Sequence, residues 1–206
     1  MSVLQHIASM QQRNDEEPNM ELARRLAASE DAEAIREIAE HVNVRDKHIQ
    51  SDCIKVLYEI GAIKPQLIAD YAESFIQLLQ HKNNRLVWGA MTALAAVAKL
   101  KADVLYNHRQ AIFDAIENGS VITIDNGIKV LAGVASADMT YNAALFPYLL
   151  NHLKHCRSKE VGQHAESIVA AVNPLNQAAF ADALKEREAS LTSAQLARVK
   201  KLYEQL

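Results

Sequence analysis

The chain has 206 residues, with 22 lysines and arginines against 25 aspartates and glutamates, which gives a formal net charge of −3. This balance argues against nucleic acid or an anionic membrane surface as a partner, because neither attracts a slightly acidic protein. Half of the residues are hydrophobic, but no apolar run reaches the roughly 18 residues of a membrane span. We therefore expect a globular protein with no membrane segment.

The two cysteines and the N-terminus predict the compartment. Cys53 and Cys156 lie far apart and follow no disulfide-framework spacing. The N-terminus lacks a basic region followed by an apolar run, so we expect no signal peptide. These features together favour a cytoplasmic protein with reduced thiols.

The first 30 residues contain the signals of N-terminal cap helices. Ser2 and Gln5 have the spacing of a helix capping box. Apolar residues at helical spacing accompany them: Val3, Ile7 and Met10. Pro18 suits the first position of a second helix, so we expect two helices within residues 1–30.

From residue 31 the apolar residues recur with a period of about 37 residues. One column of the pattern, in the first helix of each unit, reads Val42, Leu79, Ile116 and Leu153. A second column, in the second helix, reads Leu57, Leu94, Leu131 and Val169. Two-helix units at a fixed period of this length are typical of α-solenoids. The pattern predicts four repeats over residues 31–173.

The most apolar stretch of the chain, residues 86–98, lies in the second of these repeats. Apart from Thr92 it contains no polar side chain. A helix that is apolar on every side must be covered on every side, and this one is too short to cross a bilayer. We therefore expect it at the centre of the core.

Residues 121–124 test the repeat register, because all four are β-branched and could form a strand. They lie, however, in register with the starts of the other second helices, and no partner strand is evident. The register therefore predicts a helix here.

The repeat register is lost after Pro174. Thr192 and Gln195 have the spacing of a second capping box. The last helix then carries an apolar stripe: Leu196, Val199, Leu202 and Leu206. Because repeat arrays need an atypical unit to cover their ends, we expect residues 174–206 to form a C-terminal cap on the repeat that contains Ile168. The alternative is a last helix that forms a homodimer, as its stripe also suits a helical partner.

The segment 145–172 resembles a HEAT repeat, with Pro147 in its first helix and Val161, Ala165 and Val169 in its second. The resemblance extends over about residues 30–173. It implies an all-α fold, an α–α superhelix of about five or six helical hairpins in a single domain (1–206). HEAT repeats usually carry a ladder of aspartates and arginines, which is absent here because the aspartate column reads Val44, His81, Asn118 and His155. Apolar packing is therefore expected to carry the stability.

We find no glycine-rich phosphate loop, nucleophile elbow or paired metal-ligand motif in the sequence. His152, His155 and Cys156 lie three and four residues apart on a predicted helix, a spacing that could bind a metal ion. No fourth ligand is evident, and the alternative is that these residues stand at the boundary of a repeat. The sequence therefore predicts no metal, no cofactor and no catalytic residue.

Trp88 suggests one enzymatic alternative. DNA alkylation-repair glycosylases resemble HEAT arrays and use an aspartate among aromatic residues on a basic concave face. In this chain Thr92 stands one turn after Trp88, Asp125 lies one repeat away, and there is no second tryptophan. The alternative function, a nucleic-acid-acting enzyme, would require a basic concave surface with an exposed Asp125.

Two columns of small residues run along the second helices, and one of them contains Ala96 and Gly133. They serve either tight packing between repeats or an apolar groove for a partner. We expect the polar columns beside them to face solvent on the concave side. The candidate binding residues are Lys55, Trp88, Thr92, Asp125, Lys129 and His164. The predicted function is a non-catalytic scaffold or adaptor that binds a protein or peptide on its concave face.

Overall fold

The computed structural model describes residues 2–204, which form α-helices and short 3₁₀ helices and contain no β-strand. This confirms the all-α fold class. None of the helices in this part of the chain combines the length and the hydropathy of a membrane span.

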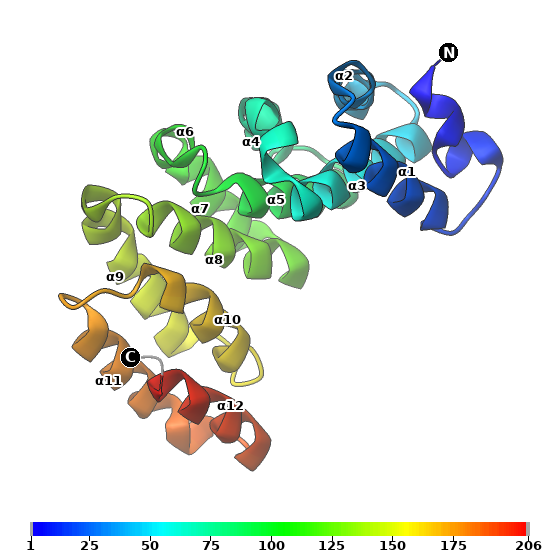
Figure 1. The fold of residues 1–206 in the computed structure, drawn as a ribbon. Coiled ribbons are helices and arrows are strands. Elements are labelled where there is room, and N and C mark those ends of the chain that lie inside the picture. The colour runs from blue at the N-terminus through cyan, green and yellow to red at the C-terminus, as the bar shows by residue number, and fades with distance from the viewer. Residues whose placement is uncertain (1, 205–206) are drawn as a thin grey trace.

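The helices lie in two layers along one curved path (Figure 1). The inner layer, on the concave side, contains α1 (Glu17–Ser29), α3 (Lys47–Ile63), α5 (Asn84–Val97), α8 (Val121–Ala135), α10 (Val161–Ile168) and α12 (Ser193–Tyr203). The outer layer contains α2 (Ala32–Glu40), α4 (Ala72–Leu78), α6 (Ala102–Asn107), α7 (Arg109–Asn118), α9 (Met139–His155) and α11 (Gln177–Arg187). Consecutive inner helices pack against one another, and this is the stacking of a superhelix.

Side-chain caps fix where many of the helices begin. Six residues accept hydrogen bonds from backbone N–H groups of the first turn: Asp31, Asp46, Asn83, Ser120, Asp138 and Thr192. These N–H groups have no partner within the helix, so each cap stabilises the helix start. The cap at Ser120 allows residues 121–124 to begin α8, as the repeat register predicted.

The core contains the columns that the register predicted. The outer-helix column is buried throughout: Val42, Leu79, Ile116 and Leu153. Three members of the inner-helix column are buried as well: Leu57, Leu94 and Leu131. Val169 is only partly buried, because the chain tightens after α10 into a 3₁₀ helix (Val169–Ala171). Together these side chains belong to one apolar cluster that extends from the first helices to the last.

Small residues allow the inner helices to approach closely. A Cβ atom on Gly133 would lie 2.6 Å from the Cβ of Ala98, and one on Gly61 would lie 3.2 Å from the Cβ of Ala96. Even a methyl group would therefore force neighbouring repeats apart at Gly133. At Ala96 and Gly133 the small residues therefore serve tight packing between repeats, and they do not form an apolar groove for a partner at these positions.

The N-terminal segment differs from the predicted helix. It forms two 3₁₀ helices (Val3–His6 and Ser9–Gln11), because Ile7 has an extended backbone that ends the first of them. Met10 is 51% exposed, so the predicted apolar stripe is wrong at this residue. Pro18 lies in the first turn of α1, as expected.

The C-terminal helices cover the end of the stack. α11 packs against α9, and α12 packs against α10 with Val199 and Leu202 buried. Arg198 of α12 forms two hydrogen bonds of 2.6 and 2.5 Å to the carboxylate of Glu166 on α10. Thr192 forms the predicted capping box, whereas Leu206 lies outside the described residues.

Replacing Leu94 with alanine is expected to lower the free energy of unfolding by about 2–5 kcal/mol, because it leaves a cavity between α5 and its neighbours. Leu94 is 0% exposed, whereas Leu100, in the turn after α5, is 50% exposed and provides the matched control. Leu100→Ala should change the stability by about 0.5 kcal/mol or less. Urea unfolding of both variants measures the difference, and equal losses would contradict the assignment of Leu94 to the core.

Deleting residues 190–206 is expected to lower the unfolding temperature at every protein concentration, because it exposes the apolar face of α10 that α12 covers. Thermal unfolding combined with light scattering measures both stability and mass. If the last helix is instead a dimer arm, the shortened chain melts like the full chain and is monomeric where the full chain is dimeric.

Candidate binding site on the inner helices

Aromatic and charged side chains gather where α1, α3 and α5 meet. We call Glu16, Lys55, Tyr58, Arg85 and Trp88 the aromatic–ion-pair cluster. The ring centroids of Tyr58 and Trp88 lie 5.7 Å apart, and the guanidinium of Arg85 lies 5.4 Å from the centroid of Trp88. Cation–π contacts of this kind fix the orientation of the indole. The only tryptophan of the chain is thus held, half-buried, on an inner helix.

Lys55 is the buried charge of this cluster. Its Nζ atom lies 2.6 Å from Glu59 Oε1 and 3.1 Å from Glu16 Oε2, and Arg85 also pairs with Glu16. Burial alone would lower the pKa of Lys55, but the hydrogen bonds to Glu59 and Glu16 outweigh it and raise this pKa. Burial would likewise raise the pKa of Glu16, yet hydrogen bonds from Arg85 and Lys55 lower it. Lys55 and Glu16 are therefore charged at neutral pH.

Thr92 links the cluster to the next repeat. Its hydroxyl donates to the backbone carbonyl of Trp88 (2.8 Å) and accepts a hydrogen bond from the amide of Asn126 on α8 (3.1 Å). The hydroxyl is therefore engaged within the protein. It orients side chains of two adjacent inner helices relative to each other.

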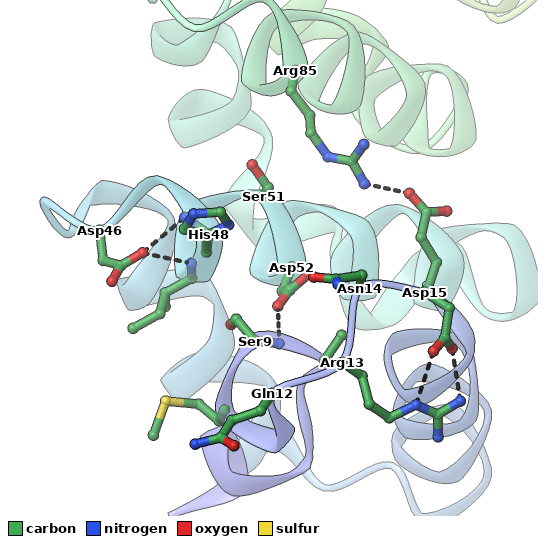
Figure 2. A pocket seen from close by; sticks show the side chains of 14 residues that line it. Ser9, Gln12, Arg13, Asn14, Asp15, Asp46, His48, Ser51, Asp52 and Arg85 are labelled. Carbon is green, nitrogen blue, oxygen red and sulfur yellow. Dashed lines mark hydrogen bonds and ion pairs between the residues drawn. The ribbon is translucent and has the colours of Figure 1, made fainter.

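A cleft of about 520 Å³ lies beside the cluster, between residues 8–16, the start of α3 and Arg85 (Figure 2). Asp52 points into this region and accepts a hydrogen bond from the backbone N–H of Ser9 (2.7 Å). Within the described residues, Ser9 Oγ and Arg85 Nε are buried without a hydrogen-bond partner. Both residues line the cleft, but these two atoms are themselves buried and are not part of its accessible surface.

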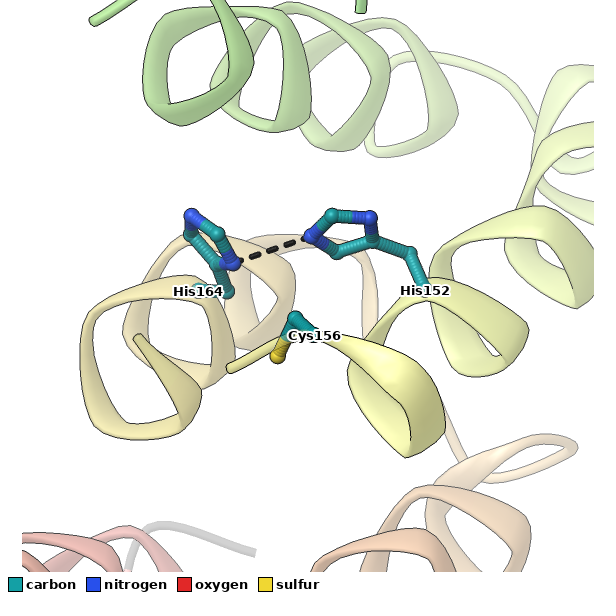
Figure 3. A group of neighbouring side chains, drawn as sticks. All are labelled: His152, Cys156 and His164. Carbon is teal, nitrogen blue, oxygen red and sulfur yellow. Dashed lines mark hydrogen bonds between the residues drawn. The ribbon is translucent and has the colours of Figure 1, made fainter. Parts of the chain in front are cut away.

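A second group of polar side chains lies between α8, α9 and α10, and we call it the histidine cluster: Asp125, His152, Cys156 and His164. Figure 3 shows the last three of these residues. His164 is fully buried, and its Nε2–H donates to Asp125 Oδ1 at 2.9 Å. Its Nδ1 lies 3.0 Å from Nε2 of His152. Burial lowers the pKa of His152 to about 4, so its ring is neutral at physiological pH.

The structure brings the predicted site residues into these two groups, with one exception. Lys55, Trp88 and Thr92 lie in or beside the aromatic–ion-pair cluster, and Asp125 and His164 lie together in the histidine cluster. Lys129 is exposed on α8 and belongs to neither group.

The expectation that all these columns face solvent is wrong for two residues. Lys55 is 6% exposed and His164 is 0% exposed. Lys55 is covered by the carboxylates of Glu16 and Glu59. His164 is covered by Asp125 and His152. Asp125 itself is only 19% exposed at its side chain, so the exposed carboxylate that the enzymatic alternative requires is not present.

Sequence reasoning missed three members of these groups: Glu16, Tyr58 and Arg85. Arg85 lies one helical turn before Trp88, and this spacing could have revealed it. Glu16 lies 39 positions before Lys55, in the loop before α1, and no local pattern indicates that contact.

No family model matches the chain, and no curated protein sequence does. Solved structures do match its fold. An engineered protein superposes with a TM-score of 0.68 at 17% identity, over 99% of this chain and 96% of its own. A designed armadillo repeat protein in complex with the peptide (KR)4 gives 0.68 at 14% identity, over 89% and 85%. Kap121p bound to Pho4p gives 0.66 at 16% identity, over 97% of this chain and 22% of that one.

The chain therefore has the fold of an α-helical repeat solenoid, which confirms the repeat architecture that the sequence resemblance implied. At these identities the likeness concerns the fold. This chain spans about a fifth of the karyopherin, so the two are comparable only over that segment.

Replacing Glu16 with glutamine is expected to make the protein less sensitive to acid. The pKa of Glu16 is lower in the folded state than its ordinary value of 4.5, so the ionised carboxylate stabilises the fold above about pH 4.5. This contribution is lost as the pH falls through the folded-state pKa.

Urea unfolding at about pH 7, 5 and 3 measures this effect. The free energy of unfolding should fall more steeply between about pH 5 and 3 in the unmodified protein than in Glu16→Gln. Glu21→Gln removes an exposed carboxylate from α1 and should keep the steep dependence. Identical slopes in all three proteins would contradict the role of Glu16.

Proposed function

We propose that the protein is a non-catalytic scaffold that binds an extended segment of a partner protein on its inner face. The observation that carries the proposal is the aromatic–ion-pair cluster, which holds a half-buried Trp88 beside the cleft at Arg85. Tryptophan and arginine are the side chains that most often dominate binding energy at protein interfaces. Here both are oriented before any partner arrives, which reduces the entropic cost of binding.

The cleft supports the same function. Exposed polar side chains line it, among them Gln12, Asn14 and His48, and the backbone N–H and carbonyl groups of a bound segment can pair with them. An extended chain offers carbonyl groups at regular intervals and can follow the curved inner layer.

The structural neighbours are consistent with this proposal. One designed armadillo repeat protein is in complex with the peptide (KR)4, and Kap121p is bound to Pho4p in one structure and to Nup53p in another. These are proteins of the same fold that hold a peptide or a protein. The proposal extends that property to the inner face of this chain.

Replacing Trp88 with alanine is expected to weaken the binding of a partner segment by about 30-fold, the equivalent of a 2 kcal/mol anchor. Segments can be selected from a random peptide library displayed on phage and then measured by calorimetry. In the unmodified protein, binding should also change the fluorescence of Trp88.

Tyr106→Ala provides the matched control, because Tyr106 of the outer helix α6 is also half-buried, stacks on Tyr141 and has Arg109 over its ring. It should leave binding unchanged. A library that yields no binder, or binders that respond to Tyr106→Ala and not to Trp88→Ala, would contradict the proposal.

A further inference from the structure

We propose that His152, Cys156 and His164 form a binding site for one divalent transition-metal ion of the zinc type. Each offers a ligand atom, and these three atoms all lie within 4.8 Å of one another. The site joins α9 to α10, and it is separate from the surface proposed to bind a partner. The sequence predicted no metal, and the spacing that it noted grouped His155 with His152 and Cys156. The fold places His164 beside these two residues instead.

The spacing of the two imidazole nitrogens is close to that of a tetrahedral site, and the three ligand atoms together lie within 4.8 Å. Zinc binds histidine nitrogen at about 2.0–2.1 Å and cysteine sulfur at about 2.3 Å, so ligand atoms around one ion lie about 3.3–3.6 Å apart. The two imidazole nitrogens lie 3.0 Å apart in the structure. A small rotation of the side chains therefore admits the ion between His152, His164 and Cys156.

The backbone places the three side chains on one side of the helix pair. His152 and Cys156 are four residues apart at the end of α9, so their side chains share a face of that helix. His164 faces them from the first turns of α10 (Figure 3). His155 is exposed, and its Nδ1 contacts the carbonyl of Asn151 at 2.8 Å.

Asp125 provides a second, independent feature of metal sites. Its carboxylate accepts the Nε2–H of the fully buried His164, which fixes the tautomer and leaves the lone pair of Nδ1 directed toward His152. Histidines that bind metals in proteins commonly donate their other N–H to a carboxylate in this way. The negative charge of Asp125 also balances the charge that remains when one thiolate binds a divalent ion.

A cleft of about 430 Å³ gives the ion a path from solvent, since His152 and Cys156 line it together with Glu160. Two histidines and one cysteine supply three ligands, so the fourth coordination position of a tetrahedral ion stays open. A water molecule in this cleft can fill that position. On binding, the thiol proton of Cys156 passes to solvent. The proton on Nε2 of His152 is also displaced, and Nδ1 of the same ring takes up a proton, so the imidazole stays neutral.

The test is a titration of the full chain with Co²⁺, under a phosphine reductant and without oxygen. A tetrahedral cobalt–thiolate site absorbs in both the near ultraviolet and the visible. We expect these bands to saturate at one ion per chain and to disappear when Zn²⁺ is added. Zn²⁺ should also raise the unfolding temperature, because an ion that binds only the folded state stabilises it.

Variants identify the ligands. Cys156→Ser should abolish the near-ultraviolet band, and His152→Ala should abolish binding at one equivalent. Asp125→Asn should weaken binding by about 10–100-fold through His164. His155→Ala and Cys53→Ser are the matched controls and should bind like the unmodified protein.

His164→Asn alters a fully buried residue and can unfold the chain, so Cys156→Ser, checked for its fold by circular dichroism, decides the question. The site is contradicted if Co²⁺ gives no thiolate band in the unmodified protein. It is also contradicted if the band persists in folded Cys156→Ser or is lost in His155→Ala.

Discussion

The structure depends on close apolar packing between consecutive inner helices. α3, α5, α8 and α10 lie against one another along the whole array, and the side chains between them are almost completely excluded from solvent. Small residues set the distance between adjacent repeats. At Gly133, for example, a methyl group would lie only 2.6 Å from the Cβ atom of Ala98. The polar ladder that is usual in HEAT repeats is absent from the sequence, so apolar contact carries most of the packing between repeats, with single polar links such as Asn126–Thr92 and His164–Asp125. Every exposed feature of the concave side is positioned by it.

The buried lysine and the buried histidine of this layer have dedicated partners, and this explains where the two clusters lie. A lysine or histidine on an inner helix faces low-dielectric surroundings, and it is stable there when carboxylates or hydrogen bonds accompany it. Lys55 meets Glu16 and Glu59, and His164 meets Asp125 and His152. The same arrangement that makes these groups tolerable also fixes their geometry. Fixed, partly accessible polar groups are what a binding surface and a metal site both require.

The repeat architecture was predictable because it depends on periodicity, a property of the sequence itself. The columns through Leu94 and Ile116 are buried as expected, except at the partly buried Val169. Residues 121–124 form a helix, as the repeat register predicted, although all four are β-branched. The site residues were less predictable, because their surroundings come from distant segments. Glu16 reaches Lys55 from a loop before the first α-helix, and α10 presents His164 to the end of α9. Such contacts depend on how the layers are packed, and the sequence pattern of one helix does not contain them.

The central claim is that the inner layer is one continuous core whose middle is the most stable part of the protein. Native-state hydrogen exchange, resolved by residue, tests it most directly. The account predicts that the backbone amides of α5 and α8 exchange most slowly, with protection that decreases toward α1 and α12 at the ends. Amides of α5 and α8 that exchange as fast as those of α2 or α12 would contradict a single core centred on these helices.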